Sequence, residues 1–418
     1  MTTSLLPFPR TAGPSLPTRL ARRLVFERLA GLSRSRLVIE EPTGTRTFGP
    51  PEAPTFVVRV HDPEAWLRMA LGGSLGAGEA YVEGLWDADD LVGVVCALAG
   101  EVAKMSALDG GRLTALRKPL DAVLHGLRRN SREGSRKNIA RHYDLGNDFF
   151  RLWLDEATMM YSAARFEREG MTLEEAQLSR LERIGRQLEL GPEDHLLEIG
   201  TGWGGLAVHA ARTTGCRVTT ATISKEQHAL AVERVRAAGL EDRVEVLLRD
   251  YRDLEGRYDK VVSVEMIEAV GAEFLETYFA KVGELVRPEG LVLIQAITIP
   301  DAGYERAVKN VDFVKRYIFP GGQCPSLAAM SGAWSRTTDL RLLHLEDFGE
   351  GYAETLRCWR ERFEARLPEV RAFGYDEAFI RLWRFYLAYC EGGFRERHCG
   401  VVQMLLAGPD ARVRPRPA

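Results

Sequence analysis

The stretch LLEIGTGWGGLAVHA, residues 196–210, decides the fold class of this chain. Apolar residues that end at Glu198 predict a buried strand, the glycines at 200, 202, 204 and 205 predict a tight turn, and a helix is expected after them. Glycine permits positive φ and a close approach of the backbone to a ligand, and the start of a helix presents free N–H groups. The pattern is typical of a cofactor-binding turn, although a purely structural turn uses the same glycines.

The turn distinguishes between two classes of cofactor. Gly200, Gly202 and Gly205 match the G-x-G-x-x-G pattern of dinucleotide-binding folds, which also require an acid about 20 residues further on to bind the ribose. The segment TTATIS, residues 219–224, contains no acid. S-adenosylmethionine has no phosphate, and Glu198 at the strand end is placed to bind its cationic amino-acid portion. The sequence therefore favours S-adenosylmethionine and disfavours an NAD-dependent oxidoreductase.

Around this turn, five strand-like runs alternate with helix-like runs: HLLEIG, RVTTATI, RVEVLLRD, YDKVVSVEM and GLVLIQAIT. Such alternation predicts an α/β domain with a parallel sheet and crossover helices. Ahead of it, FVVRVHD predicts a strand and PEAWLRMAL a helix of a small separate module. We expect a basic segment over residues 1–37, a small domain over 38–100, a linker over 101–135 and a catalytic domain over 136–410.

Length and composition exclude several classes of protein. The chain has 418 residues, enough for two or three domains, and a formal net charge of −3, which gives no signal for nucleic acid. Its six cysteines form no C-x-x-C pair, which argues against a disulfide framework or a zinc site. The first residues do not resemble a signal peptide, and the longest apolar stretch, from Leu91, is about half a bilayer crossing. A secreted or integral membrane protein is therefore disfavoured.

Positive charge is concentrated in two segments despite the overall balance. Residues 1–37 carry seven arginines against the single acid Glu27, and a second basic stretch covers residues 117–137. The segment TRLARRLVFERLAGL predicts an amphipathic helix with four leucines near one face, Leu20, Leu24, Leu29 and Leu32. Such a helix binds an anionic membrane surface, or it packs into its own domain with a solvated basic face.

Nine motifs in fixed order identify the family: GSLGAGEAYVEGLWDADDL, NIARHYDLGNDFF, MMYSAARF, LEIGTGWGGL, TISKEQ, DYRDL, SVEMIEAVG, RYIFPGG and DFGEGY. Over about residues 38–408, the chain resembles the cyclopropane-fatty-acyl-phospholipid synthases, the mycolic acid cyclopropane synthases and related fatty-acid C-methyltransferases. The resemblance implies a class I S-adenosylmethionine-dependent methyltransferase domain, Rossmann-like with a mixed seven-stranded sheet. It also implies a small N-terminal α+β domain that engages lipid.

The resemblance assigns cofactor contacts to residues in five of these motifs. Beside Glu198, the residues implied are Tyr143, Tyr161, Ser162, Gly200, Gly202, Thr222, Gln227, Asp250, Tyr251 and Arg252. The tyrosines of HYD and YSA would close over the cofactor, TISKEQ would reach the ribose, and DYRDL would lie by the adenine. A tyrosine is also a common core residue, and an aspartate at this position can also cap a helix.

The reaction of this family is methylation of an alkene. The π electrons of a cis double bond attack the sulfonium methyl, a carbocation develops on the acyl chain, and loss of a methyl proton closes a cyclopropane. The site must supply a dry acyl tunnel, aromatic faces for the cation and a base. In the family a bicarbonate ion serves as that base or its relay. Its contacting positions map onto Ala163, Glu268, Gln295, Ile297 and Tyr352.

Three of the family's usual residues are replaced in this chain. Ala163 stands where the family has Cys, and Ala269 and Gln295 stand where it has His. The Gln295 amide and the Ala163 backbone N–H still donate hydrogen bonds, but a cationic imidazole is lost and anion binding is weakened. We therefore expect Glu268 to act as the base, or the proton to leave another carbon. The second course gives a methylene- or methyl-branched acid, made with a partner reductase.

The leading hypothesis is an enzyme that adds one carbon from S-adenosylmethionine to the cis double bond of unsaturated phospholipid acyl chains. We expect it in the cytoplasm, peripherally bound to the anionic inner face of the membrane, and the resemblance implies a homodimer. Two alternatives stay open at this point. One is the same fold acting on a free or carrier-bound acid or a small polar molecule. The other is a non-catalytic protein that binds lipid or S-adenosylmethionine.

Overall fold

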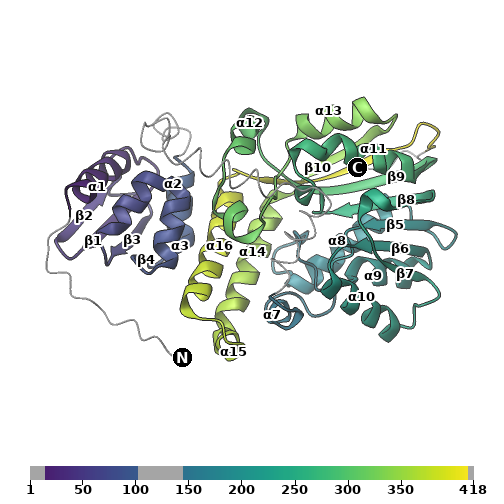
Figure 1. Cartoon of the computed structure of the whole chain (residues 1–418), viewed down its shortest axis with the longest axis horizontal. Helices are drawn as coiled ribbons and strands as arrows, with labels where there is room; N and C mark the ends of the chain where they lie inside the picture. Colours follow the sequence, from purple (N-terminus) through teal and green to yellow (C-terminus); the bar gives the residue numbers. More distant parts are fainter. Residues whose placement is uncertain (1–14, 102–144, 413–418) are drawn as a thin grey trace. The chain divides into compact units, whose positions relative to one another are not determined.

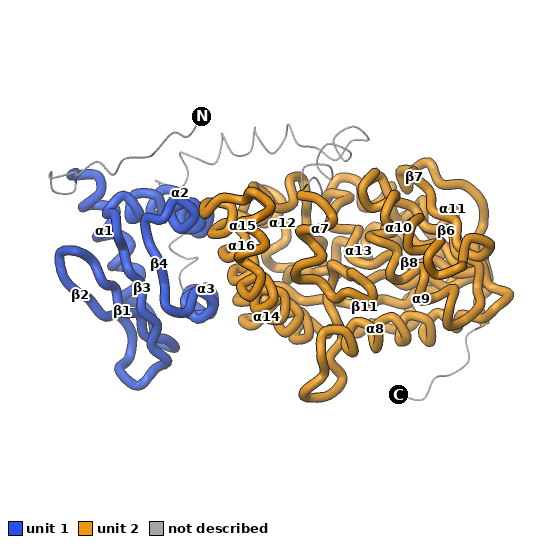
Figure 2. The backbone as a smooth tube through the Cα atoms, turned by 90° about the horizontal axis from the view of Figure 1, so that it is seen from below, with its two compact units in different colours: residues 1–119 blue, residues 120–418 orange. Residues whose placement is uncertain are grey.

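The computed structural model describes residues 15–101 and 145–412 (Figure 1). The chain divides into two compact units, residues 1–119 and residues 120–418 (Figure 2). The division falls inside the segment expected as a linker, most of which lies outside the described residues. Within the described ranges, no helix has both the length and the apolar character needed to cross a membrane.

Over residues 15–101, the first unit combines a four-stranded sheet with three helices. Its elements are α1 (Leu16–Leu29), β1 (Arg36–Glu41), β2 (Gly44–Phe48), β3 (Thr55–Val60), α2 (Glu64–Val82), β4 (Trp86–Ala88) and α3 (Leu91–Ala99). The strand order is β2-β1-β3-β4, with β1 parallel to β3 and the other pairs antiparallel. Alternate residues of the sheet are buried, as for Leu37 and Ile39 in β1 and Val58 and Val60 in β3. The strand in FVVRVHD and the helix in PEAWLRMAL are confirmed as β3 and the start of α2.

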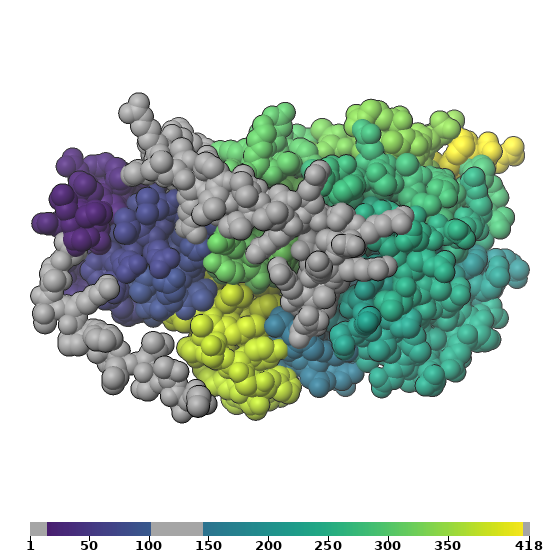
Figure 3. All heavy atoms as spheres, in the orientation of Figure 1, coloured from purple at the N-terminus to yellow at the C-terminus, as the bar shows by residue number. Residues whose placement is uncertain are grey.

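Helix α1 belongs to this unit and forms part of its surface (Figure 3). The Phe26 ring packs edge-on against Trp66 of α2, with ring centroids 5.2 Å apart. The prediction that four leucines share one face is wrong. Leu29 and Leu32 are buried, whereas Leu20 and Leu24 are 55% and 38% exposed. The reason is geometric, because nine residues at about 100° each place Leu20 and Leu29 on opposite sides of a helix.

The second unit contains a mixed sheet of seven strands, as predicted. Its strands are β5 (His195–Ile199), β6 (Arg217–Thr222), β7 (Val244–Leu248), β8 (Tyr258–Val264), β9 (Val286–Thr298), β10 (Arg341–Asp347) and β11 (Gly400–Ala407). They lie in the order β10-β11-β9-β8-β5-β6-β7. Strands β5 to β9 pair in parallel, and β11 runs antiparallel to both β9 and β10. The five strand-like runs of the sequence are confirmed as β5 to β9.

Helices cover both faces of this sheet (Figure 1). The helices in the described part of this unit are α7 (Asn147–Arg151), α8 (Leu173–Gln187), α9 (Gly205–Thr214), α10 (Lys225–Ala237), α11 (Leu275–Leu285), α12 (Asp301–Lys309), α13 (Leu327–Thr337), α14 (Gly349–Ala365), α15 (Leu367–Ala372) and α16 (Glu377–Arg395). One apolar cluster joins the sheet to α11 and α13, and a second joins it to α8 and α9. Neighbours in β9 divide between the clusters, with Ile294 in the first and Leu293 in the second. Burial on both faces explains the continuous apolar run LVLI, residues 291–294, in β9.

The order of the strands fixes where a ligand can bind. From β5 the chain proceeds to β6 and β7 on one side, and then crosses to β8 and β9 on the other. Loops therefore diverge at the carboxyl ends of β5 and β8, which is where open α/β sheets bind their ligands. Glu198, Glu265 and Gln295 lie at or near the carboxyl ends of β5, β8 and β9, respectively.

Candidate active site

The glycine turn after β5 has the backbone that the sequence predicts. Gly200, Gly202 and Gly204 have φ of 103°, 51° and 83°, a region that favours glycine. A Cβ added at Gly202 would meet nothing within 4 Å, so this residue leaves open space in front of the turn. A Cβ at Gly205, the first residue of α9, would lie 2.3 Å from the Thr158 carbonyl oxygen. Gly205 thus serves packing, whereas Gly202 leaves room for a ligand.

Glu198 lies at the end of β5 with its carboxyl group buried. Its Oε2 accepts a hydrogen bond of 2.5 Å from the Thr220 hydroxyl. Burial raises the pKa of Glu198 to about 8, although Thr220 and the cationic Arg180 act in the opposite direction. A carboxyl group with such a raised pKa is mostly protonated at neutral pH, and it ionises when a cation binds beside it. The environment therefore fits the ammonium group of S-adenosylmethionine.

The residues predicted for the ribose and adenine sides lie at the ends of β6 and β7. The Thr222 hydroxyl donates to Gln227 Oε1 at 2.9 Å, so these two side chains meet. Arg252 holds the buried Asp250 carboxylate through Nε at 2.8 Å and Nη2 at 2.7 Å. Asp250 also caps the short 3-10 helix Tyr251–Asp253 by accepting from the Arg252 backbone N–H. The capping role named as an alternative for Asp250 is present in the structure.

The YSA segment, residues 161–163, contacts helices α16 and α8 through its first two side chains. The Tyr161 hydroxyl lies 2.8 Å from the Tyr386 hydroxyl, and Ser162 Oγ accepts from Arg180 Nη1 at 2.8 Å. Ser162 is thereby engaged by a buried cation from α8. Tyr143, the remaining predicted contact, lies outside the described residues.

The five residues expected around the base are brought together, and a sixth residue, Glu265, lies among them. The Ala163 backbone N–H donates to Glu265 Oε1 at 2.9 Å, and Gln295 Nε2 donates to the same oxygen at 2.7 Å. The Tyr352 hydroxyl also hydrogen-bonds this carboxylate. The Ile297 backbone N–H donates to Oε1 of the neighbouring Glu268.

Sequence reasoning missed Glu265, although it quoted the motif SVEMIEAVG that contains it. Glu265 is the first residue after β8, and its φ of 48° is unusual for any residue but glycine. An acid directly after a buried central strand was the available signal. Burial raises the pKa of Glu265, and hydrogen bonds from Ala163 and Gln295 together with the charge of Arg180 oppose that rise.

Two further residues that the sequence analysis did not select support this carboxylate. Gln403 of β11 lies opposite Gln295 in the sheet and donates from Nε2 to Gln295 Oε1 at 2.9 Å. This contact leaves the Gln295 amide nitrogen free to point at Glu265. Arg180 is fully buried and binds Gln177 as well as Ser162. Burial lowers the pKa of Arg180 only to about 10, so it is cationic at neutral pH.

Glu268 has fewer partners than Glu265. Its Oε1 accepts from Ile297, and its Oε2 is buried without a hydrogen-bond partner among the residues described. Burial first and the charge of Glu265 second raise the pKa of Glu268 to about 8. Two carboxylates that interact in a dry site do not both ionise readily. The pair therefore retains a proton near neutral pH.

The donors expected for bicarbonate do not fit a second anion in this arrangement. The Ala163 N–H and the Gln295 amide already bind Glu265, and a bicarbonate ion at the same donors would lie against its carboxylate. Like charges at contact distance in a buried site are strongly unfavourable.

Aromatic rings form a wall beside the two carboxyl groups. Tyr352, which contacts Glu265, packs against Trp359 with ring centroids 5.9 Å apart. Trp359 packs against Tyr161 at 5.2 Å, and Tyr161 in turn approaches Phe319 at 6.1 Å. Electron-rich ring faces in a dry site attract positive charge. This wall fits the need for aromatic faces near a cation.

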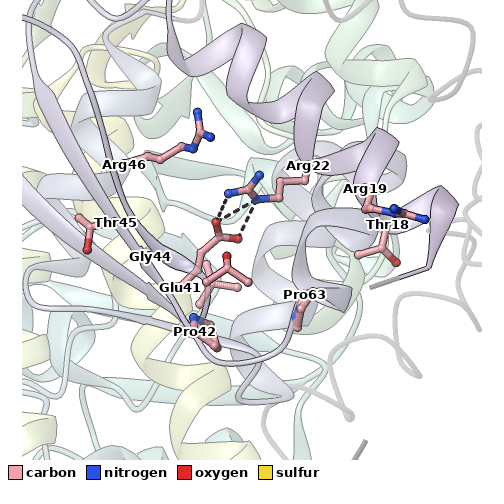
Figure 4. Close-up of a pocket in the computed structure, with 11 residues that line it drawn as sticks. Thr18, Arg19, Arg22, Glu41, Pro42, Gly44, Thr45, Arg46 and Pro63 are labelled. Atoms are coloured by element: carbon pink, nitrogen blue, oxygen red, sulfur yellow. Dashed lines mark hydrogen bonds and ion pairs between the residues drawn. The ribbon is translucent and has the colours of Figure 1, made fainter. Parts of the chain in front are cut away.

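The first unit carries a groove of about 780 Å³ with a basic lining (Figure 4). Arg19, Arg22 and Arg46 contribute to it, and Arg22 forms an ion pair with Glu41 through two of its nitrogens. Trp66 Nε1 donates to the same carboxylate at 2.7 Å, which fixes Glu41 against α2. The groove is a positively charged surface that belongs to the first unit alone.

The model of the mycolic acid cyclopropane synthetase family matches residues 130–404. The chain belongs to this family. It is similar over most of its length to the tuberculostearic acid methyltransferase UfaA1 of Mycobacterium tuberculosis, with 40% identity over 406 residues, covering 95% of this chain and 93% of the relative. The cyclopropane-fatty-acyl-phospholipid synthase of Escherichia coli K12 is 36% identical over 360 residues, covering 84% and 87%.

Two solved structures of family members match this methyltransferase. The cyclopropane synthase MmaA2 from Mycobacterium tuberculosis has a TM-score of 0.61 and 31% identity, covering 65% of this chain and 98% of its own. The mycolic acid cyclopropane synthase CmaA1, solved with SAH and CTAB, has a TM-score of 0.61 and 29% identity with the same coverage. The class I methyltransferase fold and S-adenosylmethionine as cofactor are thus confirmed. The membrane contact, the homodimer and the reductase partner stay predictions.

Proposed function

We propose that this family member transfers a methyl group to the cis double bond of an unsaturated fatty acyl chain in a phospholipid. When bound, S-adenosylmethionine supplies the electrophilic methyl carbon. The observation that carries the proposal is the pair of interacting carboxyl groups with raised pKa values, Glu265 and Glu268, beside the aromatic wall of Tyr161, Tyr352 and Trp359. An alkene is a weak, apolar nucleophile that leaves a carbocation, and such a reaction needs these groups together and without water.

Each part of the site has a distinct task in this proposal. The open space at Gly202 admits the cofactor backbone, and Glu198 binds its ammonium group. The ring faces of Tyr161 and Tyr352 stabilise positive charge on the acyl chain. The carboxyl pair accepts the proton that must leave the methylated chain. The acyl chain itself must exclude water from the site, since water would otherwise trap the cation as an alcohol.

A methylene- or methyl-branched product is a second candidate beside the cyclopropane. The relative named as a tuberculostearic acid methyltransferase aligns with 95% of this chain, which favours this candidate. Ala163, Ala269 and Gln295 favour it as well, since they remove the usual cysteine and histidines from the site. A ring forms when a methyl proton leaves and the cation closes on that carbon. A methylene branch forms when a hydride shift first moves the charge to the carbon that carries the methyl group.

We also propose that the first unit binds an anionic phospholipid surface at the inner face of the membrane. Leu16, Leu20 and Leu24 are 63%, 55% and 38% exposed, and their spacing of four residues places them along one side of α1. Arg19 and Arg23 lie between these leucines in the sequence. Exposed leucines flanked by arginines are typical of a helix that lies in a membrane interface.

The direct test is transfer of label from methyl-labelled S-adenosylmethionine to phospholipid vesicles. We expect label in anionic vesicles with cis-unsaturated chains and none in matched anionic vesicles with saturated chains. Label in neither, with cofactor binding intact by calorimetry, would reject the proposal and favour a non-catalytic binding protein. Label that enters only a free or carrier-bound unsaturated acid would instead favour the same chemistry on another substrate.

A further inference from the structure

We propose that Glu265 is the catalytic base of the methyl transfer, and that its carboxylate takes the place which the family resemblance assigns to bicarbonate. The inference rests on the proposed function and deepens it, because it names the group that receives the proton. It also changes the prediction made from the sequence, which gave that role to Glu268.

The hydrogen bonds to Glu265 are those that an anionic base requires. Two N–H donors, from Ala163 and Gln295, converge on Oε1 at 2.9 and 2.7 Å. They stabilise the ionised carboxylate and fix its orientation. Because both N–H donors occupy Oε1, we assign the incoming proton to Oε2. The Tyr352 hydroxyl, which hydrogen-bonds the same carboxylate, helps to hold it in place. Gln403 donates to the Gln295 amide oxygen, and this contact fixes the orientation in which the Gln295 amide nitrogen points at Glu265.

Comparison with Glu268 shows which of the two acids carries the charge. Glu265 is stabilised as an anion by Ala163, Gln295 and the cation of Arg180. Glu268 accepts from Ile297 at one oxygen, and its other oxygen has no partner among the described residues. The shared proton therefore resides on Glu268 near neutral pH. Glu265 is the member of the pair that can accept another.

The step balances without any further reactant. The π electrons of the double bond form a bond to the methyl carbon as its bond to sulfur breaks, so the acyl chain becomes a carbocation and the sulfonium becomes a neutral thioether. One C–H bond of the transferred methyl group then breaks. Its electron pair forms the new carbon–carbon bond, and its proton moves to Oε2 of Glu265. After the product leaves, the proton passes to solvent and the carboxylate is restored. Neither an oxidant nor an external anion is consumed.

The backbone at Glu265 makes a clean test available. Its φ of 48° is one that glycine adopts without strain, so Glu265→Gly removes the carboxylate and leaves the chain path intact. The Ala163 N–H and the Gln295 amide then face an empty space of the size of one carboxylate. A small anion such as bicarbonate or formate can bind there and resume the role of the base.

The experiment measures methyl transfer in CO₂-depleted buffer, with and without added bicarbonate or formate. We expect the wild type to be unaffected by either anion, and Glu265→Gln to lose about 100-fold or more of its turnover. We expect Glu265→Gly to be equally slow alone and to recover when bicarbonate or formate is added. Calorimetric affinity for S-adenosylmethionine should stay within about twofold of wild type in both variants, because neither substitution touches the glycine turn or Glu198.

Several outcomes would overturn the proposal. A wild type that requires bicarbonate, or a Glu265→Gln variant with normal turnover, would contradict it. Failure of bicarbonate and formate to rescue a folded Glu265→Gly variant would also contradict it. Glu268→Gln is the matched control, and a loss of turnover there with none at Glu265 would assign the base to Glu268. If the wild type itself transfers no methyl group to any acyl chain, the proposed function fails first and this inference fails with it.

Discussion

At the scale of single residues, Glu198 couples cofactor binding to a proton. Its pKa of about 8 in the free protein means that most molecules carry a proton on Glu198 at neutral pH. A bound ammonium group favours the ionised form and lowers this pKa, so the proton is expelled on binding. By the same linkage, affinity for S-adenosylmethionine rises as the pH increases toward 8, as long as the ligand keeps its ammonium charge.

Proton release can be measured by calorimetry near pH 7 in two buffers with different ionisation enthalpies. We expect the heat of S-adenosylmethionine binding to differ between the buffers in the sense of proton release. Glu198→Gln should abolish that difference and weaken binding about tenfold or more, because a hydrogen bond to a charged group is lost. Equal heats in both buffers with the wild type would show that Glu198 does not exchange its proton with the cofactor.

The residue scale is also where sequence reasoning found part of the site and missed part. The motif SVEMIEAVG contains two acids three residues apart, and only Glu268 was given a role. Which of the two faces the donors depends on the left-handed backbone at Glu265 and on an N–H from Ala163, which lies far earlier in the chain. Gln403 was missed for the same reason, since its contact depends on the register of β11 against β9.

At the scale of elements, runs of apolar residues predicted the strands correctly where the strands are buried inside the sheet. Strands β5, β6, β8 and β9 have buried residues on both faces, so the runs of apolar residues predicted these strands. Strand β7 at the sheet edge is only partly buried. The orientation of helix α1 was harder to predict, because apolar residues lie on two of its faces. Phe26 and Leu29 face the core of the first unit, and a separate row of leucines is exposed to solvent. A pattern of apolar residues alone does not distinguish these two faces.

The exposed leucines of α1 give a prediction at this scale. Replacing Leu20 and Leu24 with serine should reduce sedimentation with anionic vesicles about tenfold, since each leucine no longer transfers apolar area into lipid. The fold should be retained because neither side chain packs in the core. Leu178→Ser in α8 is the control, because Leu178 is similarly exposed at 37% but lies in the methyltransferase unit. Equal loss in the control, or none in the double variant, would contradict a lipid-binding role for α1.

At the scale of the whole molecule, the two units differ in how far the comparisons reach. The solved relatives cover 65% of the chain, whereas the tuberculostearic acid methyltransferase covers 95%. The methyltransferase fold therefore follows from sequence motifs, structure and relatives alike. The proposed role of the first unit depends on its basic groove and its exposed leucines. The sequence shows that these arginines and leucines are present, but it does not show where they lie on the folded surface.

The most direct test of the central claim uses S-adenosylmethionine with a fully deuterated transferable methyl group and vesicles of cis-unsaturated phospholipid, followed by mass spectrometry of the acyl chains. We predict a product in which two deuterium atoms remain, because one is removed as a deuteron from the transferred methyl group in both ring closure and methylene formation. Proton NMR of the unlabelled product then separates a cyclopropane from a methylene branch. Acyl chains without deuterium, from protein shown to bind the cofactor, would contradict the account.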